Sequence, residues 1–241
     1  MIQSKTQIDK LGEELKNDTI LFTGYLQLDE YRLSFASAYQ YVFDTIVQET
    51  GLMPTGRPAK TFFSIRAKLQ REKTRLSQMQ DIAGCRLICN GIKEQEHIIT
   101  QLTELFPDSK IIDRRENTSH GYRAVHLIPK ISGKLIEIQL RTENQQLWAE
   151  TSEKLADLID PMIKYGGGET EIQKLLHQLS DIIRRVENQE IKRITIKVKN
   201  AIVAVDESDS VLEEDLNVYL RKNLNHISQL NEGSEDRRKV G

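Results

Sequence analysis

The stretch Leu135-Ile136-Glu137-Ile138-Gln139-Leu140-Arg141 decides the fold of this chain, together with Ser119-His120-Gly121-Tyr122-Arg123-Ala124-Val125-His126 before it. In the first stretch, apolar residues alternate with an acid, an amide and a guanidinium. Successive side chains of a strand point to opposite faces, so the apolar row predicts a core and the polar row an open face. We expect an exposed Gly-Tyr turn, a strand over residues 122–128 and a hairpin. The open face is either solvated or functional.

The composition is that of an ordinary soluble protein. The chain has 241 residues, 29% of them charged, with a formal net charge of −2. No apolar run reaches the roughly 18 residues that span a bilayer, and no apolar signal follows Met1, so we expect a cytoplasmic protein without a membrane partner. Cys85 and Cys89 share one strand face, which predicts buried free thiols in a reducing compartment.

A local positive charge marks residues 57–86. This segment carries a net charge of +6 in a nearly neutral chain, which suits a polyanion such as nucleotide phosphates or RNA. Within a helix expected over residues 61–72, Ser64 and Lys68 are four apart, Lys60 comes one turn earlier, and Arg57 stands ahead of the helix. Such a line of donors at a helix start favours phosphate. A solvated basic helix face is the alternative.

The order of elements predicts an α+β fold, with a mixed sheet of about five strands flanked by helices. The expected helices are 5–17, 29–49 with Asp29 as a cap, 61–72, 93–105, 144–159 with Trp148 as a core anchor, 169–190 and 211–230. The expected strands are 85–89, 110–113, 122–128, 135–141 and a weakly alternating 191–205. We expect N-terminal packing helices at 1–50, a core at 51–165 and a C-terminal helical extension at 166–241.

Several short motifs follow one another in a fixed order. They are Ser64-Ile65-x-x-Lys68-Leu69, Asp81-Ile82-Ala83-Gly84-Cys85-Arg86, Gly121-Tyr122-Arg123-Ala124-Val125-His126, Glu137-Ile138-Gln139-Leu140-Arg141-Thr142 and Trp148-Ala149-Glu150. Together they resemble the synthetase domain of RelA/SpoT proteins over residues 52–154. The resemblance implies a nucleotidyltransferase-like fold and a GTP pyrophosphokinase-like activity, in which pyrophosphate passes from ATP to the ribose 3′-hydroxyl of GDP or GTP to make the alarmone (p)ppGpp. No hydrolase half is recognisable ahead of this region, so we expect a small stand-alone synthetase.

The resemblance also assigns roles to individual residues. Asp81 and Glu137 match the catalytic acidic pair that holds Mg²⁺, a cation that prefers carboxylate oxygens. The residues expected to bind ATP are Arg57 and Arg86 at the adenine and Lys60, Ser64 and Lys68 at the phosphates. The residues expected on the acceptor side are Tyr122, which stacks on the base, with His126 beside it on the same strand face, and Gln139 and Arg141 on the face of Glu137.

Two departures from the family pattern leave alternatives open. Arg57 stands three residues before Lys60 instead of two, and Glu153 replaces a histidine that many alarmone synthetases carry on the acceptor side. A toxin of the same fold would pyrophosphorylate the tRNA 3′ end or make adenosine alarmones, with an antitoxin as partner. A non-catalytic nucleotide-binding module is the third hypothesis. Homo-oligomer formation also stays open.

Overall fold

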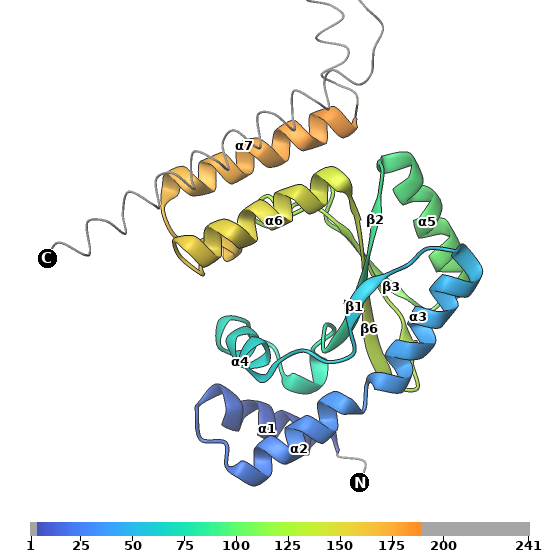
Figure 1. Ribbon diagram of the computed structural model, residues 1–241. Coiled ribbons are helices and arrows are strands. Elements are labelled where there is room, and N and C mark those ends of the chain that lie inside the picture. The colour runs from blue at the N-terminus through green and yellow to red at the C-terminus, as the bar shows by residue number, and fades with distance from the viewer. Residues whose placement is uncertain (1–3, 189–241) are drawn as a thin grey trace, which may run out of the picture. The chain divides into compact units, whose positions relative to one another are not determined.

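The computed structural model describes residues 4–188, and Figure 1 labels its helices and strands. The helices are α1 (Lys5–Lys16), α2 (Phe22–Leu33), α3 (Ala36–Thr50), α4 (Phe62–Arg71), α5 (Ile92–Leu105), α6 (Glu143–Leu158) and α7 (Thr170–Glu187), with short 3₁₀ turns at Leu76–Gln78 and Ile163–Tyr165. The strands are β1 (Thr55–Arg57), β2 (Ala83–Cys89), β3 (Lys110–Asp113), β4 (Val125–Ile128), β5 (Lys130–Ile131) and β6 (Lys134–Thr142).

The strands form one mixed sheet in the order β1-β2-β6-β4-β3, and the two-residue β5 pairs with β6. β2 and β6 are parallel, whereas every other pairing is antiparallel. Parallel neighbours need a crossover connection, and the chain between β2 and β6 supplies one that contains α5. The predicted α+β fold with a mixed sheet flanked by helices is therefore confirmed.

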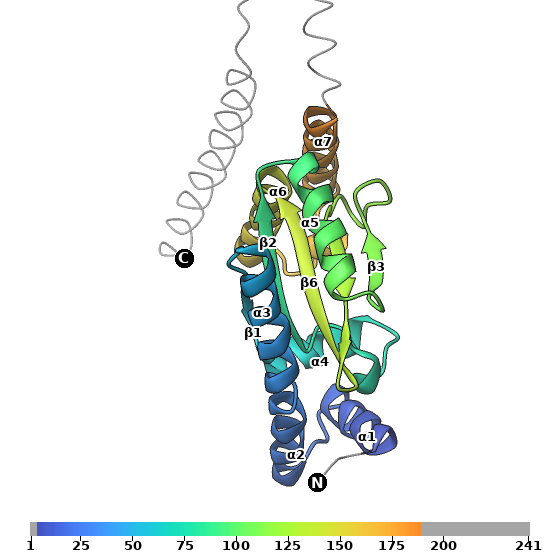
Figure 2. The ribbon, with the colours of Figure 1, turned by 90° about the vertical axis from the view of Figure 1, so that its right-hand side faces the viewer.

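The alternation along β6 divides the sheet into two faces. Ile136, Ile138 and Leu140 are fully buried on one face, which α3 and α5 cover (Figures 1 and 2). Glu137 and Gln139 point to the other face, and α4 lies on that side of the sheet (Figure 1). The hydrophobic core thus fixes which side of β6 presents the polar row.

The expected helix over residues 29–49 is wrong, because the chain forms two helices there. α2 ends at Leu33 and α3 begins at Ala36, so Asp29 lies inside α2 and caps nothing. Two contacts account for the break. The Ser34 hydroxyl donates to the Tyr31 carbonyl at 2.6 Å, which competes with helical bonding, and Phe35 turns into the core with 3% exposure.

The expected exposed turn and long strand around Tyr122 are also wrong. β4 begins only at Val125, Gly121 is buried and Tyr122 is half-buried. The backbone enters the left-handed region at His120 (φ 55°) and Gly121 (φ 85°), which ends any extended run. A Cβ on Gly121 would lie 2.8 Å from the Trp148 ring, so glycine permits this close packing.

Contacts divide the chain into two compact units. Among the described residues, the first comprises residues 4–119 and Arg123–Gln146, and the second comprises His120–Tyr122 and residues 147–188. The core of the first unit forms between the sheet and its covering helices. In the second unit α6 and α7 pack around Trp148, which is 4% exposed and donates its indole N–H to the Leu176 carbonyl at 2.8 Å. The predicted role of Trp148 as a core anchor is confirmed.

Several smaller predictions concern burial and the C-terminal segment. Cys85 and Cys89 are buried free thiols, as expected. Within residues 4–188 no helix is both long enough and apolar enough to cross a membrane. The strand expected at 191–205 and the helix expected at 211–230 lie outside the described residues.

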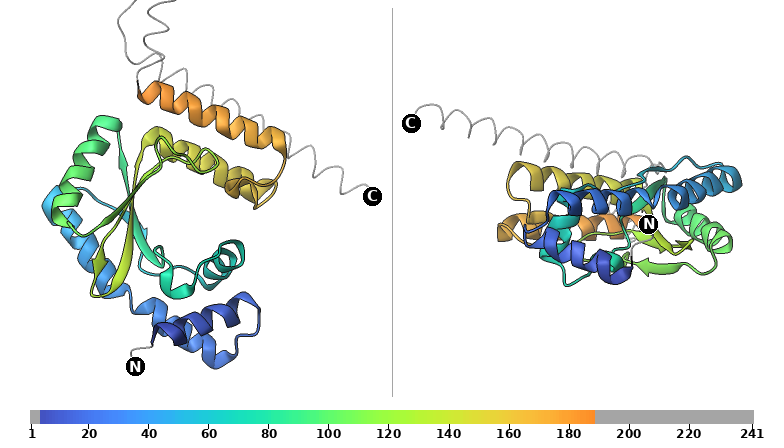
Figure 3. Two further views of the ribbon diagram at one scale, coloured as in Figure 1. Left: turned by 180° about the vertical axis from the view of Figure 1, so that it is seen from behind. Right: turned by 90° about the horizontal axis from the view of Figure 1, so that it is seen from below.

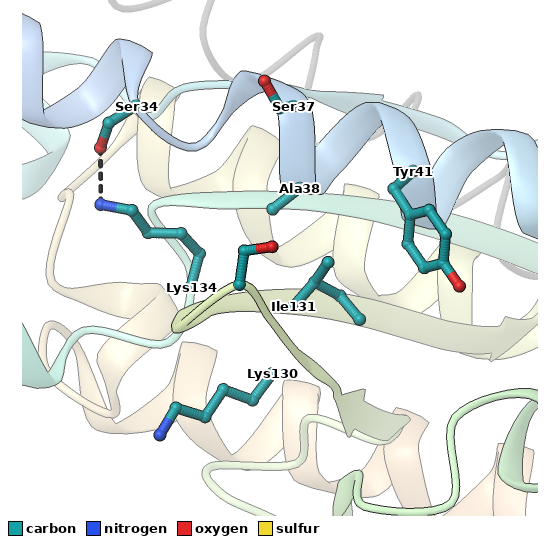
Figure 4. Close-up of a pocket in the computed structure, with 8 residues that line it drawn as sticks. Ser34, Ser37, Ala38, Tyr41, Lys130, Ile131 and Lys134 are labelled. Carbon is teal, nitrogen blue, oxygen red and sulfur yellow. Dashed lines mark hydrogen bonds between the residues drawn. The ribbon is translucent and has the colours of Figure 1, made fainter.

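A pocket of about 460 Å³ lies between the start of α3 and the β5–β6 turn (Figure 4). The Lys134 ammonium donates to the Ser34 hydroxyl at 2.6 Å and lies 4.5 Å from the centre of the Phe35 ring. Burial lowers the pKa of Lys134. None of the residues predicted for the functional site lines this pocket.

Candidate active site

The centre of the site is Asp81, which shares its carboxylate between two lysines. Lys60 Nζ lies 2.6 Å from Oδ2 and Lys68 Nζ lies 2.9 Å from Oδ1. All three side chains are largely buried, with exposures of 18% for Asp81, 11% for Lys60 and 21% for Lys68. Lys68 Nζ also lies 4.0 Å from Glu72 Oε2, so both ammonium groups are held by carboxylates of the protein.

Local structure brings the two lysines to the same carboxylate. Thr61 caps α4 by accepting from the Ser64 N–H at 3.2 Å, so Lys60 lies just before the helix and Lys68 two turns along it. The Lys60 N–H donates to the Ile82 carbonyl at 2.6 Å, which fixes Lys60 beside Asp81. The Ser64 hydroxyl accepts from the Thr61 hydroxyl at 2.9 Å and so belongs to the cap of this helix.

The electrostatics keep Asp81 ionised. Burial alone would raise the pKa of the carboxyl, but Lys60 and Lys68 more than offset burial and lower the pKa to about 2. Opposite charges within hydrogen-bond distance stabilise the charged form of a carboxyl group. Asp81 is therefore an anion at any physiological pH.

Glu137 is the second carboxylate of the site. Its Oε1 lies 2.8 Å from His126 Nδ1, and Gln139 Nε2 donates to its Oε2 at 2.7 Å. Burial opposes ionisation of Glu137, but the bond from His126 prevails, so the pKa of Glu137 is lowered. The negative charge of Asp81 acts in the opposite sense and raises the pKa of Glu137, because the two carboxylates repel each other.

The strand register places the predicted residues in rows on one face of the sheet. Arg57 pairs with Gly84, which pairs with Glu137. A Cβ on Gly84 would lie 2.6 Å from the Glu137 backbone oxygen, so glycine lets β2 and β6 approach and leaves the middle of this row without a side chain.

The next row along the sheet contains Arg86, Gln139 and His126. Arg86 pairs with Gln139 across β2 and β6, and Gln139 pairs with His126 across β6 and β4. Residues directly opposite in neighbouring strands share a face. Arg86 is half-buried there, whereas Arg57 in the row before is exposed.

Arg141 closes the polar row of β6. Its Nη2 donates to the Gln139 Oε1 at 3.2 Å and its Nη1 to the Gln146 Oε1 at 2.9 Å. The residue is only 4% exposed, so its guanidinium acts here as a support for Gln139 and through it for Glu137. Gln146, at the start of α6, is a contributor that no sequence motif indicates.

Tyr122 and Glu153 belong to the second unit. The Tyr122 ring meets the Trp148 ring edge to face, with centroids 6.3 Å apart. Because Tyr122 precedes β4, the predicted shared strand face of Tyr122 and His126 is wrong. Glu153 is exposed on α6. A stacking role for Tyr122 stays a prediction.

Asp81 and Glu137 are the two carboxylates of the site that could together hold a divalent cation. Within residues 4–188 no group of three or more His, Cys, Asp or Glu side chains could hold a metal ion. Mg²⁺ is commonly bound by one or two carboxylates together with substrate phosphates. Asp81 and Glu137 supply two ionised carboxylates that repel each other, a repulsion that a divalent cation relieves.

Comparison with known proteins gives sequence relatives. Residues 56–156 match the family described as the region found in RelA/SpoT proteins. An uncharacterized protein of Mycobacterium tuberculosis (strain H37Rv) is 36% identical over 118 residues, which are 47% of this chain and 43% of that protein. This chain thus covers less than half the length of the mycobacterial relative. GTP pyrophosphokinase YwaC of Bacillus subtilis is 27% identical over 173 residues, 63% of this chain and 80% of that protein.

Solved structures share the fold. The small alarmone synthetase 1 from Bacillus subtilis has a TM-score of 0.51 at 23% identity, over 72% of this chain and 98% of that chain. Its structure bound to its product pppGpp has a TM-score of 0.54 at 22% identity, over 74% and 99%. Residues 56–156 therefore match the region found in RelA/SpoT proteins, and the fold of the chain is that of the small alarmone synthetase structures.

Proposed function

We propose that the chain is a pyrophosphokinase that transfers pyrophosphate from ATP to the ribose 3′-hydroxyl of GDP or GTP, with (p)ppGpp as product. The observation that carries this proposal is the cluster of Lys60, Asp81 and Lys68, which lies just ahead of β2, next to the strand β6 that bears Glu137. Two ammonium groups, one just ahead of α4 and one in its last turn, suit a triphosphate, and two ionised carboxylates suit its metal ion.

The acceptor 3′-oxygen attacks the β-phosphorus of ATP, the new O–P bond forms, and the bond between the β-phosphorus and the α–β bridging oxygen breaks, so that AMP leaves. The hydroxyl proton becomes acidic as the O–P bond forms. A carboxylate with a lowered pKa, such as Glu137, can then accept the proton and release it to water.

Each part of the site has a proposed role in that step. Lys60 and Lys68 bind the phosphates, and Ser64 maintains the helix start that adds backbone N–H groups to them. His126 and Gln139 hold Glu137 in one orientation. Bound Mg²⁺, held by Asp81 and Glu137, would neutralise charge that develops on the transferred group.

The remaining roles come from the family resemblance. Arg57 and Arg86 would enclose the adenine from β1 and β2. The Arg86 side chain is half-buried on the sheet, whereas the Arg57 side chain is exposed. Tyr122 would stack on the acceptor base. Arg141 would act through Gln139 and so is a positioning residue.

The relatives support the proposal. The Bacillus subtilis relative is named a GTP pyrophosphokinase, and the small alarmone synthetase 1 binds pppGpp as its product. A tRNA 3′ end or an adenosine nucleotide as acceptor, an antitoxin partner, a homo-oligomer, a cytoplasmic location and the domain division at residues 50 and 165 stay predictions of the sequence.

Thin-layer chromatography with ATP labelled on the β-phosphate tests the function. We expect label on GDP or GTP in the presence of Mg²⁺, and loss of transfer in Asp81→Asn and Glu137→Gln. Asp108→Asn changes an exposed carboxylate of the same unit and should retain full transfer. Label on tRNA or on an adenosine nucleotide, with none on guanosine nucleotides, would replace the proposed acceptor. No transfer to any acceptor would refute the enzyme and favour the nucleotide-binding module.

A further inference from the structure

Arg32, near the end of α2, reaches into the candidate active site from outside every sequence motif. Its Nε donates to the Lys60 backbone carbonyl at 2.6 Å, over a separation of 28 residues. Its Nη1 donates to the Asp29 carboxylate at 2.5 Å, one helical turn earlier. The side chain is only 14% exposed, and Figure 3 shows α1 and α2 beside α4.

The same guanidinium also contacts the other side of the α4 cap. The Arg32 Cζ lies 4.2 Å from the centre of the Phe62 ring, which in turn meets the Tyr25 ring edge to face at 5.7 Å. Tyr25, Asp29 and Arg32 follow at helical spacing, so one face of α2 is directed at the start of α4. Arg32 therefore contacts Lys60 and Phe62, the residues on either side of the capping residue Thr61.

Lys60 is consequently fixed at three points. The Ile82 carbonyl accepts from its N–H, Arg32 donates to its C=O, and its Nζ binds Asp81. Lysine carries large rotamer freedom, and Lys68 repels it across the shared carboxylate. A backbone held on both sides directs the Lys60 side chain before any nucleotide arrives, which lowers the entropy lost on binding.

The charge of Arg32 suits this task. Asp29 balances the guanidinium, and Arg32 contacts the backbone of Lys60 instead of its ammonium, so the contact does not add to the repulsion between the lysines. A charge-assisted bond to a carbonyl is stronger than a neutral one. The contact between Arg32 and the Phe62 ring would be enough to pack α2 against α4, so the bond to the Lys60 carbonyl is additional to helix packing.

We propose that Arg32 is a positioning residue, which acts through the Lys60 backbone to hold the phosphate-binding lysine in its productive place. The identity of the bound triphosphate rests on the proposed function. The inference assigns a functional role to the N-terminal helices, for which the sequence indicates packing alone.

The test compares matched methionine variants, which keep the straight stem and remove the donors. Arg32→Met should raise the KM for ATP by about 10-fold to 100-fold, while the KM for the acceptor stays unchanged. Arg32→Lys, which keeps one donor for the carbonyl, should restore part of the loss. Arg66→Met is the control, because Arg66 on α4 pairs with Asp18 at 2.8 Å and has no contact with Lys60 among the described bonds. It should change the KM for ATP less than 2-fold.

A double-mutant cycle with Lys60→Met separates positioning from packing. If Arg32 acts through Lys60, adding Arg32→Met to Lys60→Met should leave ATP affinity unchanged. Additive losses, or equal effects of Arg32→Met and Arg66→Met on the KM for ATP, would overturn the inference. Urea unfolding of each variant is the control for folding, because the KM values are compared only between variants with the same folded fraction under assay conditions. If the chain transfers no pyrophosphate, the proposed function fails, and the cycle is read from calorimetric Kd values for ATP.

Discussion

Replacing Asp81 with asparagine removes the carboxylate that Lys60 and Lys68 share and keeps the size of the side chain. Burial opposes ionisation of Asp81, yet the two lysines lower its pKa from 3.8 to about 2. One pKa unit corresponds to about 1.4 kcal/mol, so the ion pairs, after the opposing effect of burial, contribute a net of about 2 kcal/mol to the free energy of unfolding at neutral pH. The Asp81→Asn variant should be less stable by about that amount at pH 7.

The pH dependence follows from the sign of the shift. The pKa of Asp81 is lower in the folded state, so its stabilisation is fully present above 3.8 and is lost as the pH falls through about 2. At pH 3 about 1 kcal/mol should remain. A protonated carboxyl group resembles an amide, so the two proteins should converge in stability at lower pH.

Urea unfolding followed by circular dichroism at pH 7, 5 and 3 measures this difference. Asp108→Asn, which removes an exposed carboxylate, serves as the control and should change stability by less than about 0.5 kcal/mol. If Asp81→Asn loses the same free energy at pH 7 and at pH 3, the ion pairs with the lysines are not the source of the loss. A loss at pH 7 no larger than that of the control would refute the reasoning altogether.

Three further predictions concern the sheet. His126→Ala removes the bond that lowers the pKa of Glu137, so the acidic limb of the pH–rate profile should move to higher pH, and an unmoved limb would contradict this role. Gly84→Ala should destabilise the fold by about 1–3 kcal/mol in thermal or urea unfolding, because its Cβ would lie 2.6 Å from the Glu137 backbone oxygen. The Cβ of Gly91→Ala meets nothing, so this variant, which changes only the N-cap of α5, should lose less than about 1 kcal/mol. Burial raises the pKa of both cysteine thiols to about 12, so a thiol reagent at pH 8 should react with neither until urea unfolds the protein, and rapid reaction in buffer would refute their burial.

The fold follows from the sequence wherever the signal is local. The alternation of β6 and the helical spacing of Ser64 and Lys68 each depend on residues a few positions apart, and both predictions are confirmed. The single helix over residues 29–49 was wrong because a hydroxyl bond at Ser34 and the burial of Phe35 decide the break. Tertiary packing overrode the helical periodicity there.

The polar row of β6 shows which parts of the candidate site could be predicted from the sequence. Alternation and motif order identify Glu137, Gln139 and Arg141 as one row, and the structure connects them by hydrogen bonds. The family resemblance places His126 on the acceptor side, and only the sheet order brings it to Glu137, because β4 is the antiparallel neighbour of β6. Tyr122 was misplaced because two left-handed residues before it start β4 later than the pattern indicates.

The sequence by itself indicated the residue types expected in the site, their order along the chain and the shared face of Glu137, Gln139 and Arg141 on β6. Tertiary structure alone decided the pairings: Lys60 and Lys68 with Asp81 over 21 and 13 residues, His126 with Glu137 over 11, and Arg32 with Lys60 over 28. Periodicity specifies a face of a helix or strand but not its neighbour, because strand order and helix docking arise from burial of the whole core. The protonation states of Asp81 and Glu137 depend on those pairings, so they too were settled only by the fold.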